Sequence, residues 1–329
     1  MLGSSLTLCQ PTDPVNSRMT SLFSHNMIFI TGKGGVGKTT LALGVALEAA
    51  AQGHRTIVCE VGEHRRAPEI LGVPAGADGA ETPIADNLWS TSISPRRALE
   101  EWLSQQVGSR SLMQVLTKSN AFQYFVAAAP GTDELVTMTK VWELTQNERW
   151  SRRAEDPYDV VVVDAPASGH GLALLAAPAT FASVARVGPI AKQAGRVDAF
   201  LKDPHRVAYM AVTLAAELPV TETVELEAAL AEQLGRPLDA VVANQVLPRR
   251  FAASDLERVG AARGRPRVST APARAARSQA AQVVEQQAQL RRLRREARAP
   301  VHTLPFVVAE RLALADVRRL GRSAARAVE

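Results

Sequence analysis

The sequence has few cysteines and no long apolar run, and both absences narrow the class of protein it can encode. Its 329 residues include only two cysteines, Cys9 and Cys59. Two isolated thiols provide neither a disulfide framework nor the CxxC ligand pairs of a structural zinc site. No apolar stretch approaches the roughly 20 residues that a membrane-spanning helix needs, and the first residues lack the pattern of a secretory signal. We therefore expect a cytoplasmic protein without a transmembrane segment.

Aromatic residues are scarce where positive charge is concentrated. The formal net charge is +5, yet residues 251–299 alone hold eleven arginines against four acidic residues. No aromatic residue lies between Ala252 and Pro305, so this segment offers no stacking platform for the bases of a nucleic acid. We therefore expect a solvated helix there and no nucleic-acid binding. The alternative is that its positive charge contacts nucleic acid or anionic lipid.

The overall composition is that of a soluble globular protein, with 46% hydrophobic and 22% charged residues. Short apolar runs alternate with helical patterns. This alternation predicts a doubly wound, mainly parallel sheet with helices on both faces. The predicted strands are residues 27–31, 56–61, 88–93, 160–164, 207–214, 240–247 and 302–307.

The residues that indicate chemistry follow the first predicted strand. The stretch GKGGVGKTT, residues 32–40, fits G-x-x-x-x-G-K-[ST], in which a glycine-rich loop between a strand and a helix surrounds phosphates with backbone N–H groups. Lys38 would add positive charge at the β- and γ-phosphates, and the Thr39 hydroxyl would bind Mg²⁺. The predicted ATP-binding residues are Gly32, Lys33, Gly34, Gly35, Val36, Gly37, Lys38, Thr39, Thr40 and Asn244.

Asp164 and Asn244 each end an apolar strand and fit the same site. Asp164 lies in YDVVVVDAPASGH, residues 158–170, and would hold Mg²⁺ together with Thr39. Asn244 lies in VVANQVLP, residues 241–248, where burying an amide is costly unless its donor and acceptor find partners. An adenine edge offers both kinds of partner. ATP and Mg²⁺ are the expected cofactors.

Two segments interrupt the strand–helix alternation, residues 95–153 and the arginine-rich residues 251–299. Residues 95–153 show only helical patterns and begin at Ser94-Pro95, a pair that favours a helix start. We interpret this segment as a helical subdomain inserted into a nucleotide-binding core. The predicted organisation is a disordered lead (1–26), the first part of the core (27–94), the helical insertion (95–153), the second part of the core (154–250), the arginine-rich helical segment (251–299) and a last strand with a C-terminal helix (300–329).

Lys33, at the second position of the loop, points to a family. A KGG loop is the signature of the deviant P-loop ATPases, and four stretches resemble those of the ArsA-like members, which include the arsenite-pump ATPase and the ATPase that targets tail-anchored proteins. These stretches, in family order, are APGTDEL (129–135), YDVVVVDAPASGH, ELPVTET (217–223) and VVANQVLP. In ELPVTET, Thr221 is also a good helix N-cap.

The resemblance implies an ATPase that works as a nucleotide-gated dimer. ATP and Mg²⁺ would lie at the dimer interface, Lys33 would reach across it towards the γ-phosphate, and Asn244 would read adenine. The second subunit would be another copy or a paralogue. A protein client would bind through the helical subdomain, where the apolar run 122–127 either lines a groove or packs against the main domain.

The sequence departs from the family pattern after the second strand. Where the family has an Asp that polarises the attacking water, IVCEVGEHRR, residues 57–66, places Gly62 between Glu60 and Glu63. Glu63 either joins Lys33 and Lys38 as a catalytic residue or is an exposed switch-loop carboxylate. The first alternative predicts an active ATPase, and the second a weakly active or inactive partner of a paralogous ATPase. A ParA- or MinD-like positioning ATPase, which would bind DNA through residues 251–299, is a third alternative.

Overall fold

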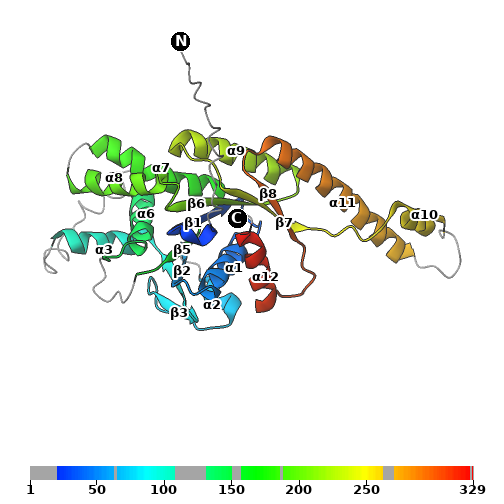
Figure 1. Ribbon diagram of the computed structural model, residues 1–329, viewed down its shortest axis with the longest axis horizontal. Helices are drawn as coiled ribbons and strands as arrows, with labels where there is room; N and C mark the ends of the chain where they lie inside the picture. Colours follow the sequence, from blue (N-terminus) through cyan, green and yellow to red (C-terminus); the bar gives the residue numbers. More distant parts are fainter. Residues whose placement is uncertain are drawn as a thin grey trace, which may run out of the picture.

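A mainly parallel sheet forms the centre of the protein (Figure 1). The computed structural model describes residues 21–62, 65–107, 131–149, 157–185, 188–261, 270–326 and 328. Within them, eight strands follow the order β3-β4-β2-β5-β1-β6-β7-β8, and every neighbouring pair except β3–β4 is parallel. The strands are β1 (Met27–Gly32), β2 (Thr56–Val61), β3 (Thr82–Ala85), β4 (Leu88–Ile93), β5 (Val160–Asp164), β6 (Val207–Leu214), β7 (Ala240–Val246) and β8 (Val301–Pro305). The predicted α/β fold class is confirmed.

The sequence pattern did not predict β3. This strand has only four residues, contains Pro83 and pairs antiparallel with β4 at the edge of the sheet. Proline lacks a backbone N–H and is therefore tolerated at a sheet edge but not inside it. A short strand with a proline gives too weak a pattern to be recognised.

Helices cover both faces of the sheet, and alternate residues of each strand face opposite layers (Figure 1). In β1, Ile28 and Ile30 pack in the core under α1, whereas Met27 and Phe29 pack in the core under α7 and α9. The first layer contains α1 (Lys38–Ala51), α2 (Arg66–Leu71) and α12 (Leu314–Ala325); the second contains α3 (Pro95–Val107), α6 (Thr132–Leu144), α7 (Ser168–Ala185), α8 (Pro189–Lys202), α9 (Glu217–Leu234) and α11 (Thr270–Glu296). None of the helices within the described ranges is both long and apolar enough to cross a membrane.

The fold begins earlier than predicted. Residues Leu22–Ser24 form a 3-10 helix, and Leu22 and Phe23 are buried in the core under α1. His25 is also buried, with its ring nitrogen Nδ1 2.9 Å from the Leu22 carbonyl oxygen. The predicted disordered lead, 1–26, is therefore wrong for residues 22–26, because the polar composition before them concealed two buried apolar side chains. Residues 1–20 lie outside the described part.

Buried ion pairs attach α6, in the helical insertion, to the edge of the sheet. Arg149, which follows α6, donates from Nη1 to Glu81 Oε2 at 2.7 Å, and its Nε lies 3.3 Å from Glu143 Oε1. Lys140 contacts Glu143 on the same helix at 3.0 Å. The side chains of Arg149 and Glu143 are almost inaccessible to solvent. The run 122–127, predicted to meet either a client or the main domain, lies outside the described residues.

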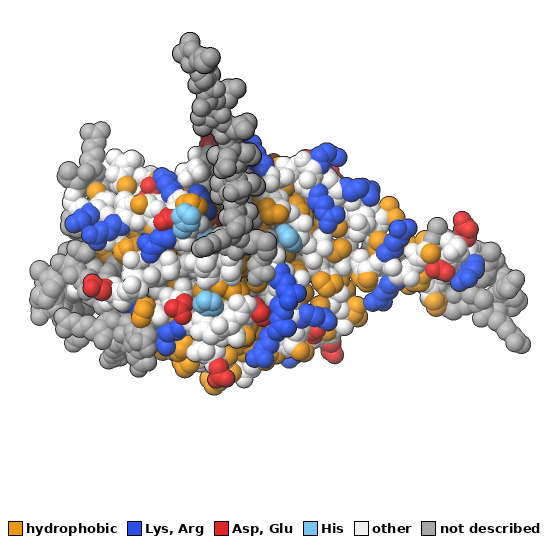
Figure 2. Space-filling model, in the orientation of Figure 1, with side chains coloured by type: hydrophobic (Ala, Val, Ile, Leu, Met, Phe, Trp, Pro, Cys, Tyr) orange, Lys and Arg blue, Asp and Glu red, His pale blue; other side chains and the backbone are white. Residues whose placement is uncertain are grey.

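The arginine-rich segment is mostly helical and extends away from the body as α10 (Ala253–Ala261) and α11 (Figure 1). Leu290 and Leu293 on α11 are buried, whereas Val284 on the same helix is 68% exposed. On the face shown in Figure 2, basic side chains along α11 alternate with apolar and uncharged ones. We see no continuous basic surface on that face.

Substitution of Gly321 should destabilise the fold, because α1 and α12 meet through glycine backbones. A Cβ atom at Gly321 would lie 2.0 Å from the Gly44 carbonyl oxygen. We expect Gly321→Ala to lower the free energy of unfolding by about 1–3 kcal/mol in urea denaturation. The control is Gly195→Ala in the interior of α8, where a Cβ has open space and alanine should stabilise the helix by up to about 1 kcal/mol. Equal stability of Gly321→Ala and the wild type would contradict this packing.

Candidate nucleotide-binding site

Parallel strand register brings the predicted site residues to one edge of the sheet. Residue 30 of β1 lies opposite Asp164 of β5, and Gly32 lies opposite Val212 of β6. The glycine-rich loop, residues 32–37, leaves β1 at this edge and ends where α1 begins at Lys38. Carboxyl ends of parallel strands are where open α/β sheets bind ligands.

Two glycines of the loop are required by close backbone approach. Gly32 has φ +140°, and a Cβ there would lie 2.1 Å from the Val212 carbonyl oxygen. Gly37 has φ +98°, and a Cβ there would lie 2.4 Å from Asn244 Nδ2. Both positions combine a backbone conformation that disfavours side chains with a lack of space for one. The loop can therefore lie this close to Val212 of β6 and Asn244 of β7 only with glycine at these positions.

Lys38, Thr39 and Asp164, three of the candidate site residues, lie close together at this edge. Thr39 Oγ1 donates to Asp164 Oδ2 at 2.6 Å, and Lys38 Nζ donates to the Lys33 carbonyl oxygen at 2.9 Å. Burial raises the pKa of Asp164, although the Thr39 hydrogen bond and the Lys38 charge oppose this rise. Burial likewise lowers the pKa of Lys38, and Asp164 opposes that change. Both charges therefore lie where water screens them poorly.

The Thr39–Asp164 pair fits a magnesium ion. Asp164 Oδ1 is buried and has no hydrogen-bond partner among the described residues. A hydroxyl and a carboxylate are the oxygen ligands that Mg²⁺ prefers, and Mg²⁺ usually keeps several waters that a free carboxylate oxygen can accept. A bound cation would also compensate the cost of burying the ionised Asp164.

Asn244 lies beside the loop at the end of β7. Its Nδ2 donates to the Val36 carbonyl oxygen at 2.9 Å, and its Oδ1 accepts from the Gln245 backbone N–H at 2.9 Å. Each amide atom keeps capacity for one further hydrogen bond. Asn244 therefore braces the loop in this structure, and its predicted contact with adenine remains compatible with that role.

Lys33 forms an ion pair that the sequence did not indicate. Its ammonium contacts Glu222 Oε1 on α9, and the two side chains are 37% and 28% exposed. Glu222 belongs to ELPVTET, the stretch in which Thr221 was predicted as an N-cap. That prediction is wrong, since α9 begins at Glu217 and Thr221 Oγ1 donates to the Glu217 carbonyl oxygen within the helix. Contacts between residues this far apart in sequence have no local signal.

Glu60, rather than Glu63, is the carboxylate that the structure describes near Asp164. Glu60 lies opposite Asp164 in the β2–β5 register, is 4% exposed, and accepts the Arg66 N–H at 2.7 Å and the Ala67 N–H at 3.2 Å. Burial raises the pKa of Glu60, and the neighbouring Asp164 adds to this effect against the two backbone hydrogen bonds. Glu63 lies outside the described residues.

The two remaining matched stretches each begin a helix. In DAPASGH, α7 starts at Ser168, directly after the turn that follows Asp164. In APGTDEL, α6 starts at Thr132 after Gly131, which has φ +83°. Asp133 and Glu134 lie in the first turn of α6, where negative charge is favourable to the helix dipole.

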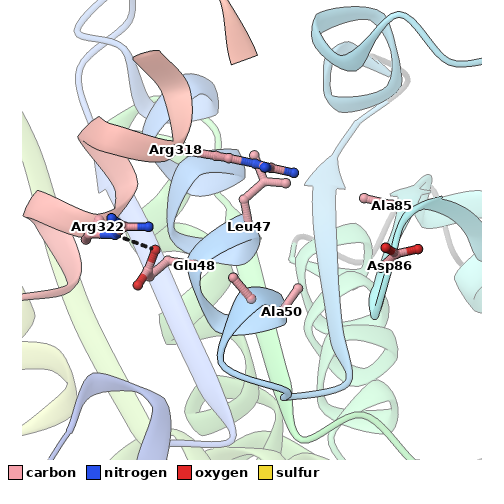
Figure 3. A pocket seen from close by; sticks show the side chains of 8 residues that line it. Leu47, Glu48, Ala50, Ala85, Asp86, Arg318 and Arg322 are labelled. Carbon is pink, nitrogen blue, oxygen red and sulfur yellow. Dashed lines mark hydrogen bonds and ion pairs between the residues drawn. The ribbon is translucent and has the colours of Figure 1, made fainter. Parts of the chain in front are cut away.

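A separate cavity of about 410 Å³ lies at the other end of α1 (Figure 3). It is lined by residues of α1, α12 and the β3–β4 turn, and Arg322 Nε donates to Glu48 Oε2 at 3.2 Å across it. Ten residues of helix separate Glu48 from Lys38, or about 15 Å. This cavity therefore has no part in the nucleotide site.

These features define a class of protein. A glycine-rich loop between β1 and α1, a Lys–Thr pair at the helix start and an Asp on the adjacent parallel strand are the parts of a P-loop nucleotide-binding site. The family model described as anion-transporting ATPase, ArsA_ATPase, matches residues 25–195. The chain belongs to this ArsA-like ATPase family.

Curated relatives agree with this family. The chain is 29% identical over 246 residues to a putative arsenical pump-driving ATPase of Halobacterium salinarum, an alignment that covers 72% of this chain and 38% of that protein. It is 28% identical over 245 residues to the ATPase BagA of Mycobacterium tuberculosis, covering 73% and 70%. With the ATPase GET3 of Kluyveromyces lactis it shares 28% identity over 190 residues, covering 54% of each chain. The chain thus spans little more than a third of the halobacterial protein.

We expect Asp164→Asn to stabilise the nucleotide-free protein near neutral pH. The buried Asp164 has a raised pKa, so its ionised form costs folding free energy above that pKa, and this cost disappears as the pH falls and the carboxyl is protonated. A neutral amide should add about 1 kcal/mol at pH 7, and this gain should shrink as the pH falls through the raised pKa of Asp164. Urea unfolding at several pH values measures this, with Asp198→Asn, at a partly exposed site, as the control. A destabilised Asp164→Asn chain at pH 7 would contradict the expectation.

Proposed function

We propose that the chain binds ATP with Mg²⁺ and hydrolyses it to ADP and phosphate, and that this cycle opens and closes a dimer that acts on a protein client in the cytoplasm. The observation that supports this proposal most is the Thr39–Asp164 hydrogen bond of 2.6 Å next to the glycine-rich loop. This hydrogen bond puts the two proposed metal ligands next to each other, and Lys38, the proposed phosphate ligand, directly precedes Thr39 in the chain.

Each site residue then has a defined task. The loop N–H groups and Lys38 hold the phosphates, Thr39 and Asp164 hold Mg²⁺ directly or through water, and Asn244 contacts adenine. The metal would neutralise charge on the phosphates. In phosphoryl transfer, positioning and charge stabilisation carry most of the rate enhancement, so the residues need no covalent step.

A dimer is supported by the position of Lys33. It lies in the glycine-rich loop and its side chain is 37% exposed, so it can reach a phosphate outside its own loop. The second subunit would be another copy of the chain or a paralogue. The relatives include a putative arsenical pump-driving ATPase and GET3, which do not point to one common client. The client of this chain is therefore left open, with the helical insertion as its proposed docking region.

Gly62 lies where the family has the Asp that polarises the attacking water, so the proposed function can take two forms. In the active form, Glu63 or the adjacent loop orients the attacking water. In the silent form, the chain binds nucleotide but relies on a paralogous subunit for hydrolysis. The buried Glu60, which anchors the start of α2 through Arg66 and Ala67, would fix one end of the loop that carries Glu63 in either case.

We expect Lys38→Ala to lose at least about 100-fold in affinity for ATP with Mg²⁺, because a charge-assisted contact to the phosphates disappears. Isothermal titration calorimetry of the purified chain measures the affinity. Lys192→Ala is a matched control, since Lys192 is exposed on α8, and it should bind as the wild type does. Wild-type affinity in Lys38→Ala would refute the site.

Phosphate release in the steady state separates the active form from the silent one. The active form predicts measurable turnover that falls by about 10- to 1,000-fold in Lys33→Ala and in Glu63→Gln, since each removes transition-state positioning or charge. Nucleotide affinity should change much less than turnover. Turnover unaffected by Glu63→Gln would exclude it as the residue that orients water, and no turnover without a second protein would favour the silent form.

A further inference from the structure

Lys33 is the loop residue whose task requires it to move, yet in the isolated chain its ammonium is paired with Glu222. The partner comes from α9 and not from the loop itself, 189 residues further along the chain. The remaining Glu222 oxygen, Oε2, is buried and has no hydrogen-bond partner among the described residues. Among the described residues, the contact of this carboxylate is therefore the ion pair between its Oε1 and Lys33.

Glu222 is presented by a rigid element. Val220 and Thr223 on either side of it are buried, and Thr223 Oγ1 donates to the Pro219 carbonyl oxygen at 2.7 Å. The loop is more open, since Gly34 and Gly35 next to Lys33 are exposed and have space around them. Breaking the ion pair would thus move Lys33 and leave Glu222 in place.

The position of Lys33 also affects Lys38. The Lys33 carbonyl oxygen accepts the hydrogen bond from Lys38 Nζ at 2.9 Å. A change in the loop at residue 33 therefore changes where the ammonium of Lys38 lies. The ion pair with Glu222 and this hydrogen bond thus link both loop lysines to α9.

We propose that Glu222 is a positioning residue that retains Lys33 on its own subunit until a triphosphate competes for it. This inference rests on the proposed ATP binding. The pair is partly exposed, and such pairs bias an equilibrium only modestly. A triphosphate with its larger charge can release Lys33, whereas a diphosphate lacks the phosphate that Lys33 would reach. Glu222 therefore weakens ATP binding but not ADP binding, and it makes the release of Lys33 depend on the γ-phosphate.

Nucleotide binding to Glu222→Gln tests the proposal. Removing the carboxylate charge should tighten ATP binding about two- to fivefold by ending the competition, and should leave ADP binding unchanged. The matched control is Glu225→Gln, an exposed glutamate of the same helix. Equal affinities of Glu222→Gln and the wild type for ATP, weaker ATP binding, or an equal shift for ATP and ADP would overturn the proposal.

A double-mutant cycle separates this role from a structural effect of Glu222. In a Lys33→Ala background, Glu222→Gln should no longer alter ATP affinity, because the side chain it restrains is gone. A persistent effect would mean that Glu222 acts through another group.

Hydrogen exchange without nucleotide gives a readout that does not depend on ATP binding. Amides of residues 33–37 should exchange faster in Glu222→Gln than in Glu225→Gln, because the loop loses its attachment to α9. Unchanged exchange would overturn the retention of Lys33. If exchange increases but no variant, including the wild type, binds ATP, the proposed function fails while the ion pair stands.

Discussion

The close approach of the glycine-rich loop to β6 and β7 is the constraint on which the nucleotide site depends. Gly32 touches the Val212 carbonyl and Gly37 touches the Asn244 amide with no room for a Cβ atom. These contacts exist only because β1, β6 and β7 end in parallel at one edge. The same edge places Asp164 beside Thr39. The sheet topology therefore sets the positions of the loop and of Asp164 independently of their charges.

Burial disfavours the ionised forms of two charged groups in the site, and a bound ligand would offset part of this cost. Burial raises the pKa of Asp164 and lowers the pKa of Lys38, so both are less stable in their ionised forms than they would be in water. Proteins that place such groups together at a sheet edge give up folding free energy for function. An anion near Lys38 and a cation near Asp164 would each remove part of that cost.

Local patterns predicted the strands and the loop but not the contacts between distant segments. Strand β5 could be recognised because four consecutive valines precede Asp164, and the loop because its glycines and lysines are adjacent in the chain. The edge strand β3 carries too few residues for a pattern, and the burial of Leu22 depends on α1, which the local sequence cannot reveal. The pairing of Lys33 with Glu222 spans 189 residues, and only the folded chain brings them together.

Buried ion pairs limit how α6 can move relative to the edge of the sheet. Arg149 and Glu143 are buried together and joined to Glu81 beside β3, and removing one partner of a buried pair typically costs about 3–5 kcal/mol. Any movement of α6 relative to this edge must therefore either preserve this network or exceed that cost. Because the network joins α6 to the β3–β4 edge, the cheaper movement keeps them together as one unit. Leu135 of α6 also packs with Ala177 of α7 and Ala194 of α8, so α6 contacts the helix that begins shortly after Asp164 as well as the β3–β4 edge.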